Sequence, residues 1–361
     1  MWPRSRPVLA LGVTLACQPS QADTSPFTTA PPSSDGTSTS TGSSSSSAGS
    51  GSSTSTSTGA ELSTGSGSAS SSTGGTTLLL DVGTDQDVGP GTPVGCKGKI
   101  DFLFVISRYG GMSYFQKQLL DAFPKFIDAI EAKFSDFDFH IMVVDGDPTW
   151  GSETCDGQCP AQCEPGYPCD YVPDTCDLTI GAGTVFPAGF DASNKPCDID
   201  GGRSYMTKDQ TNLKATFACA AQVGSSGAPW IGEALAAALK PGINGPGGCN
   251  EGFLRDDALL MVTLISNTYD YGPKPWGSSG FPETWRAAVL AAKHDDAESV
   301  VMFSILDPGE PDCHPDDRTC QMVKTFPYHL LIERDVPDYG PAFIEATELV
   351  DVACEGFTPP G

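Results

Sequence analysis

The sequence predicts an α/β fold in which a mostly parallel sheet is covered by helices on both faces. Short apolar runs rich in β-branched and aromatic residues alternate with amphipathic segments of helical periodicity. Each run is apolar along nearly its whole length, as is typical of strands buried on both faces. The predicted strands are 99–107, 138–145, 256–266 and 298–306.

Helical segments follow these strands. The first begins near Ser113, whose spacing to Gln116 is typical of a capping box, and its apolar positions continue on one face to Phe134. Pro124 lies inside this segment and predicts a kink or a break. Further helices are expected at 211–223, 231–240, 283–294 and 341–357.

Composition excludes several classes of function. The chain of 361 residues carries a net charge of −25, so the basic surface of a nucleic-acid-binding protein is absent. It has no G-x-S-x-G, H-E-x-x-H or P-loop motif, and its histidines stand in unrelated contexts. We therefore expect no enzymatic activity and no cofactor. A count of 13 cysteines favours an oxidising compartment.

Residues 1–17 have the pattern of a signal peptide. Arg4 and Arg6 precede a short apolar segment that ends at Ala16. The segment VTLAC resembles the lipobox of bacterial lipoproteins, which implies that Cys17 carries a lipid and becomes the first residue of the mature chain. This predicts an exported lipoprotein at the outer membrane or cell surface, attached to the membrane through its lipid alone. A secreted protein with an ordinary signal peptide is the alternative.

Residues 18–95 are nearly all Ser, Thr and Gly, so they predict a disordered tether that cannot bury enough apolar surface to fold. The folded domain is expected at 96–361. Within it, the stretch at about 146–206 is rich in Cys, Gly, Pro and Asp and predicts an insertion with little regular structure.

The stretch KIDFLFVISRYGGMS (99–113) resembles the first motif of von Willebrand factor type A domains, and especially of Cys-rich type A lipoproteins of bacterial surfaces. In that family the strand ends in an Asp-x-Ser-x-Ser loop that holds a divalent metal. The sequence GEAL at 232–235 and the segment 247–266 add to the resemblance, which covers roughly 96–361. It implies a Rossmann-like, three-layer fold.

The metal-binding positions of that family hold other residues here. The resemblance places Ser107 at the first carboxylate, Tyr109 and Gly111 at the two hydroxyls, Asn267 at the second aspartate, and the threonine near 225–227. Divalent cations such as Mg²⁺ are usually bound with at least one carboxylate. The motif is therefore degenerate, and we expect no metal at this loop.

Two uses of the loop remain open. Arg108 and Tyr109 would lie at the carboxyl edge of the sheet, where ligands of open α/β folds bind, and an exposed Tyr and Arg favour protein recognition. Alternatively, Tyr109 fills the vacated cavity. A shifted metal site that uses Asp256, Asp257 or Asp270 is a further alternative.

Without Cys17, the other cysteines are even in number and can all form disulfides. The spacings in the insertion do not fit a zinc site. The termini of type A domains lie close together, which implies that Cys96 pairs with Cys354, and Cys313 with Cys320 would form a local bridge. Other pairings stay open. The disulfide candidates are Cys96, Cys155, Cys159, Cys163, Cys169, Cys176, Cys197, Cys219, Cys249, Cys313, Cys320 and Cys354.

Together these features predict a lipid-anchored envelope protein that recognises a protein or surface macromolecule without metal. The alternatives are a metal-dependent adhesin with a shifted acidic site, a passive structural lipoprotein, and a hydrolase whose catalytic groups lie in the cysteine-rich insertion.

Overall fold

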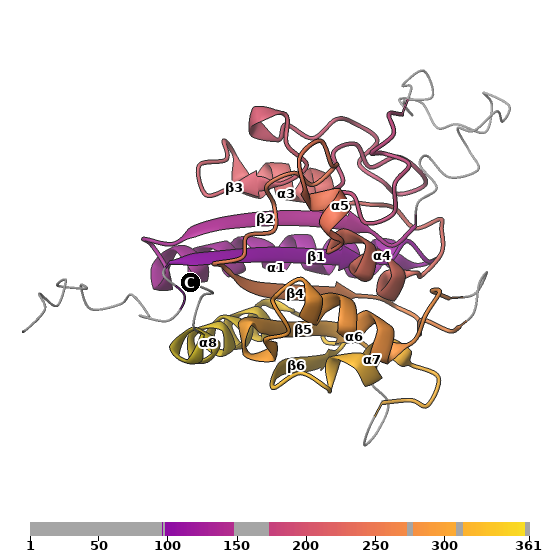
Figure 1. Cartoon of the computed structure of the whole chain (residues 1–361). Coiled ribbons are helices and arrows are strands. Elements are labelled where there is room, and N and C mark those ends of the chain that lie inside the picture. Colours follow the sequence, from indigo (N-terminus) through magenta and orange to yellow (C-terminus); the bar gives the residue numbers. More distant parts are fainter. Residues whose placement is uncertain (1–95, 97, 148–172, 273–276, 308–312, 358–361) are drawn as a thin grey trace, which may run out of the picture. The chain divides into compact units, whose positions relative to one another are not determined.

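The computed structural model describes residues 96, 98–147, 173–272, 277–307 and 313–357 (Figure 1). The predicted signal peptide with Cys17, the tether at 18–95 and part of the cysteine-rich insertion lie outside these residues. Cys155, Cys159, Cys163 and Cys169 lie outside them as well. No helix in the described ranges is both long and apolar enough to cross a bilayer.

The described elements alternate along the chain as the sequence predicts. The strands are β1 (Lys99–Ile106), β2 (Asp138–Asp145), β3 (Met206–Thr207), β4 (Leu259–Ile265), β5 (Val300–Leu306) and β6 (Tyr328–Glu333). The α-helices are α1 (Met112–Lys133), α3 (Leu213–Ala221), α4 (Ile231–Ala238), α5 (Pro241–Asn244), α6 (Pro282–Ala291), α7 (Arg318–Val323) and α8 (Gly340–Gly356), with short 3-10 helices η2 (Asp200–Gly202) and η3 (Ala297–Ser299).

The sheet has six strands in the order β3-β2-β1-β4-β5-β6 (Figure 1). Every neighbouring pair is parallel except β2 and β3, which are antiparallel. The expected α/β class with a mostly parallel sheet is therefore confirmed. Because parallel strands end on the same side, the loops that follow β1, β2, β4, β5 and β6 share one edge of the sheet, which we call the loop edge.

Helices cover both faces of the sheet, as the three-layer prediction requires. Alternate residues of β1 point to opposite faces. Phe102 and Phe104 join a buried cluster with residues of α1, α3 and α8. Leu103 and Val105 join a second cluster with residues of α4, α6 and α7.

Phe104 is at the centre of the first cluster. Its ring lies 4.9 Å from that of Phe217 in α3, and 6.1 and 6.0 Å from those of Phe123 and Phe126 in α1. Phe343 of α8 lies 6.4 Å away. One buried strand residue thus fixes the positions of helices from distant parts of the sequence, with edge-on ring contacts that are favourable beyond the area they bury.

The first helix corrects two local expectations. It is a single helix, Met112–Lys133, that continues through Pro124. Its N-cap is Gly111, in the left-handed region at φ 85°, and no side chain caps it, so the predicted capping box is wrong. Gln116 is buried instead, and its Nε2 donates to the carbonyl oxygen of Gly224 at 2.6 Å.

The short elements β3, α7 and β6 were not predicted. The sequence of β6, YHLLIE, is only partly buried, because β6 is the last strand of the sheet and its neighbours cover it on one side. It therefore lacks the continuous apolar character that identified the inner strands.

Disulfides join segments that are distant in the sequence. Cys96, before β1, is bonded to Cys354 in α8, and Cys313 is bonded to Cys320 in α7. These are the two pairings named from the sequence. The cysteine-rich segment is joined to the core by the bridges Cys176–Cys249 and Cys197–Cys219.

Candidate functional site

The loop edge brings together residues that are far apart in the sequence. Ile106, the last residue of β1, is in register with Asp145 of β2 and with Ile265 of β4. The residues that follow these strands, Ser107 and Ser266 among them, therefore start side by side. The sequence-predicted positions of the degenerate metal motif fall on these loops.

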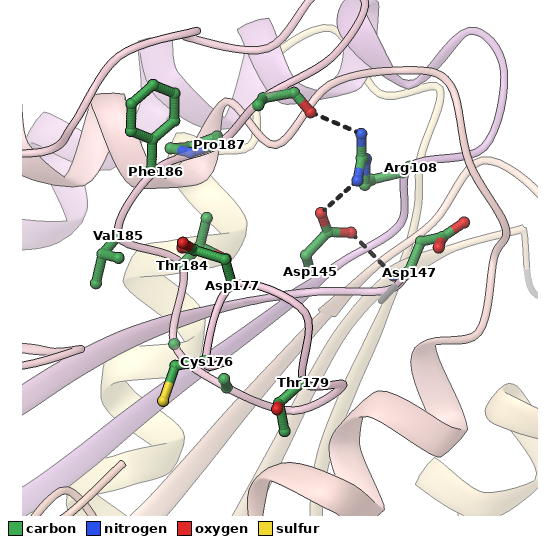
Figure 2. Close-up of a pocket in the computed structure, with 13 residues that line it drawn as sticks. Arg108, Asp145, Asp147, Cys176, Asp177, Thr179, Thr184, Val185, Phe186 and Pro187 are labelled. Carbon is green, nitrogen blue, oxygen red and sulfur yellow. Dashed lines mark hydrogen bonds and ion pairs between the residues drawn. The ribbon is translucent and has the colours of Figure 1, made fainter. Parts of the chain in front are cut away.

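Arg108 is the central cation of this edge. Its side chain is almost completely buried, at 1% exposure. Its Nη1 lies 3.1 Å from Oδ2 of Asp145, and its Nη2 donates to the carbonyl oxygen of Ala188 at 2.9 Å. Figure 2 shows the guanidinium of Arg108 with its ion pair to Asp145. The expectation that Arg108 is exposed is wrong, because Asp145 and Ala188 together draw it into the interior.

The carboxylates beside Arg108 organise two further loops. Asp145 Oδ1 accepts a hydrogen bond from the backbone N–H of Asp147 at 2.9 Å (Figure 2). Asp147 Oδ2 in turn accepts one from the backbone N–H of Ala228 at 2.5 Å. A Cβ at Gly227 would lie 2.8 Å from Asp147 Oδ2, so the close approach needs glycine there. Burial raises the pKa of Asp145 to about 7 despite the opposing charge of Arg108.

The residues at the metal-motif positions bond to the protein itself. Ser107 is buried, and its Oγ accepts from the backbone N–H of Tyr109 at 3.1 Å. Asn267 turns an amide N–H toward the loop, donating to the carbonyl oxygen of Gly110 at 2.7 Å. A Cβ at Gly111 would lie 3.3 Å from this same Asn267 nitrogen. The Oδ1 of Asn267 is buried without a hydrogen-bond partner among the described residues, but a set of residues with no carboxylate does not fit a divalent cation.

The segment expected near the family's threonine is also held internally. The Oγ of Ser225 donates to Oδ2 of Asp191 at 2.5 Å. Gln116 bridges this segment to the first loop, because its Nε2 lies 3.4 Å from the carbonyl oxygen of Ser107 as well as bonding Gly224. Gln116 thus links the two segments, while the Oγ of Ser226 is buried without a hydrogen-bond partner in the part of the chain that the structure describes.

The acidic residues proposed for a shifted metal site do not come together. Asp270 is buried, accepts from the backbone N–H of Ser278 at 2.6 Å and pairs with Arg318 at 3.2 Å. Asp257 pairs with Lys99 at the start of β1, at the opposite edge of the sheet, and Asp256 neighbours it in sequence. Within the described ranges, no group of three or more His, Cys, Asp or Glu side chains could hold a metal ion.

Exposed and half-buried aromatic residues lie on the loop edge. Tyr109 and Tyr271 are each 41% exposed and Tyr114 is 60% exposed, so Tyr109 does not fill a vacated cavity. Tyr269 stacks on His314, with ring centroids 4.6 Å apart, and its ring lies 5.5 Å from that of Tyr271. We call Tyr109, Tyr114, Tyr269, Tyr271 and His314 the aromatic surface.

The sequence indicated only part of this surface. Tyr109 was identified from its motif position, and the signal for Tyr269 and Tyr271 was their place just after a buried strand. The position of His314 next to Tyr269 depends on the Cys313–Cys320 disulfide, which holds the loop of His314 to α7. The bond between Asn267 and Gly110 joins the two loops that carry Tyr109 and Tyr269.

Carboxylates surround the aromatic surface. Asp307 and Asp335 lie 2.9 and 3.6 Å from the guanidinium of Arg334, and the side chain of Asp335 is 70% exposed. Asp316, beside His314, is 66% exposed. The single positive charge of Arg334 is shared by Asp307 and Asp335, and Asp316 adds a further negative charge. The surroundings of the aromatic surface are therefore acidic.

No protein-family model and no curated protein matches the sequence. Solved structures with distant similarity include proximal thread matrix protein 1 from the mussel byssus, at 12% identity and TM-score 0.33 over 72% of this chain and 47% of that one. A pilus adhesin, SpaC from Lactobacillus rhamnosus GG, matches at 12% identity and TM-score 0.32 over 70% of this chain and 30% of that one. This chain thus spans less than half of either, and nothing about activity or ligand follows from similarity at this level.

Replacing Arg108 tests its role as the internal cation. We expect Arg108→Met to lower the free energy of unfolding by about 1–3 kcal/mol, because it leaves the part-buried Asp145 without its partner. Combining it with Asp145→Leu should recover part of that loss. Chemical denaturation of the single and double variants measures both effects. An unfolding free energy within about 0.5 kcal/mol of wild type for Arg108→Met would rule out this role.

Stability should fall as pH rises. Burial raises the pKa of Asp101 to about 6, of Asp145 to about 7 and of Asp317 to about 6, while burial lowers that of His140 to about 4. A carboxyl whose folded pKa exceeds its unfolded value, near 4, stabilises the fold fully below that value and loses the contribution as pH rises through the folded pKa. His140 acts in the opposite sense between about pH 4 and 6.5, but the carboxyls outweigh it.

We therefore expect a lower melting temperature at pH 8 than at pH 5, with the decrease falling mainly between about pH 5 and 7. Thermal unfolding followed by circular dichroism across this range measures it. A melting temperature that rises steadily from pH 5 to pH 8 would contradict the assignment of these buried carboxyls.

Proposed function

We propose that this chain is an exported recognition protein that binds a protein partner through the aromatic surface without a bound metal. The observation that carries the proposal is that three exposed tyrosines, Tyr109, Tyr114 and Tyr271, stand on the loop edge. Tyrosine is enriched among the residues that contribute most to protein interfaces, because it offers a large, stiff contact area with a polar end.

The loops that carry the aromatic surface are held in place before any partner binds. Asn267 is bonded to Gly110, and the Cys313–Cys320 bridge holds the loop of His314. Arg108 anchors the backbone next to Tyr109 through Asp145. Binding would therefore order few additional residues, and preorganisation of this kind favours affinity.

The surrounding charge favours a basic partner. Asp316 and Asp335 are exposed beside the aromatic surface, and the whole chain carries −25. Basic side chains on a partner would be attracted during approach and could lie against the tyrosine rings. A partner with a large acidic face would be repelled.

Metal-independent binding is supported by the donors present at the motif positions. Ser107 Oγ is bonded to the Tyr109 N–H, and Asn267 presents an N–H to Gly110. Neither a carboxylate nor a free pair of hydroxyls stands at these positions. A chelator should therefore leave binding unchanged.

Export is supported by the four disulfides within the described residues, since such bridges are typical of oxidising compartments. We infer that the lipobox-like segment attaches the chain to the envelope through Cys17. The Ser/Thr/Gly-rich stretch at 18–95 would separate the domain from the membrane and extend the reach of the aromatic surface.

Alanine variants test the recognition surface. We expect Tyr109→Ala combined with Tyr271→Ala to weaken capture of a protein from bacterial envelope extracts by at least about tenfold, because truncation removes the main contact rings. The control is Val352→Ala, an exposed apolar residue near the end of α8. Quantitative mass spectrometry of captured proteins, in parallel samples with and without EDTA, measures the effect.

The recognition proposal fails if wild type and the double variant capture the same proteins equally, and the chain is then better described as a passive component. Capture that EDTA abolishes would instead favour the metal-dependent alternative.

Replacement of Cys17 tests the anchor separately. We expect Cys17→Ser to move the chain from the membrane fraction to the soluble exported fraction, because no thiol remains to carry lipid. Fractionation with immunoblotting, and metabolic labelling with a fatty acid, measure the change. Unlabelled wild type that is already soluble would favour the secreted alternative.

A further inference from the structure

The two outer strands of the sheet differ in a way that concerns association. β3 forms one edge and is only two residues long. β6 forms the other edge with six residues, YHLLIE, most of them apolar and none of them Lys, Arg or Pro. Natural proteins commonly protect edge strands by shortening them or by placing Lys or Pro in them. The β3 edge follows this rule and the β6 edge does not.

The free side of β6 is defined by one hydrogen bond. The backbone N–H of Arg334 donates to the carbonyl oxygen of Leu306 at 2.7 Å, so the alternate residues before it, Ile332 and Leu330, also turn toward β5. The N–H and C=O groups of His329, Leu331 and Glu333 therefore point away from the sheet. Among the described strands none pairs with that side, and Figure 1 shows β6 at the outer limit of the sheet.

We propose that a second copy of this chain pairs with β6, antiparallel across a two-fold axis at Leu331. Only outward-pointing residues of each copy exchange hydrogen bonds, which limits the possible registers. In the register centred on Leu331, that residue faces Leu331 of the second copy, and His329 faces Glu333 of the second copy. Leu330 then faces Ile332 of the second copy.

This register makes the strand complementary to itself. Opposite each apolar side chain stands another apolar one, and the acidic Glu333 stands opposite a histidine rather than another carboxylate. Cross-strand apolar and opposite-charge pairs stabilise a sheet, whereas like charges directly opposite destabilise it. A two-fold interface closes after two copies, so the open edge is removed without forming a fibre.

The side chains on β6 would gain cover from this pairing. Leu330 and Ile332 are partly buried against the cluster under α1 and α8, and Leu331 against the cluster on the other face. Each has a side that remains exposed at the end of the sheet. In the paired sheet the second copy's equivalents lie next to them on both faces.

Net charge opposes the association. Each copy carries −25, so two copies repel at low ionic strength, where screening is weak. The backbone hydrogen bonds and apolar pairs are much less sensitive to salt. Self-association should therefore strengthen when ionic strength is raised from about 0.02 M to about 0.15 M, where the Debye length is about 8 Å.

Sedimentation equilibrium of the full chain in a mild detergent tests the proposal. We expect a monomer–dimer equilibrium that shifts toward dimer with salt. His329→Pro removes an outward N–H without touching the bonds to β5, and we expect it to weaken the dimer at least tenfold with little change in melting temperature. His329→Ala, which keeps the N–H, is the matched control and should weaken it less.

A charge exchange tests the register independently of proline. His329→Glu alone places two carboxylates opposite each other and should weaken the dimer, whereas adding Glu333→Lys places opposite charges across the axis and should recover most of the affinity. A wild-type chain that stays monomeric at all concentrations overturns the proposal. This is the result expected if another part of the chain already covers β6. A dimer that none of these substitutions affects, or one that the double variant weakens further, overturns it as well.

Discussion

An ion pair between the buried Arg108 and the part-buried Asp145 is the constraint on which the loop edge depends. The guanidinium joins the loop after β1 to the end of β2 and, through the carbonyl oxygen of Ala188, to the cysteine-rich segment. A buried charge without its partner is strongly unfavourable, so these segments are held to one arrangement. In that arrangement Arg108 is buried and Tyr109 is 41% exposed.

The same ion pair gives a physical reading of the altered metal motif. The sequence resemblance predicts a divalent metal at this edge, whereas in the structure a buried cation of the protein itself, Arg108, stands there. An arginine needs carboxylates around it, and Asp145 and Asp147 are there. An arginine, unlike a divalent metal, needs no hydroxyl ligands from the loop. Tyr109 and Gly111 can therefore occupy the positions where the motif has hydroxyl residues.

The inner strands could be predicted from the sequence because strands buried on both faces are apolar along their whole length. Phe102, Phe104 and their neighbours form such a run. The sequence did not predict β6, whose residues are half-buried, nor the true role of Gln116, whose partner Gly224 is far away in the chain. The inward turn of Arg108 depends on Asp145 in the same way. Local patterns identify elements, whereas the site is made by pairs that only the fold brings together.

Crystals soaked in Mn²⁺ and measured at a wavelength that gives anomalous scattering would test the role of Arg108 most directly. The account predicts no manganese peak within bonding distance of Ser107 or Asn267, with the guanidinium still between Asp145 and Ala188. An occupied manganese site at those residues, with Arg108 displaced from Asp145, would contradict it.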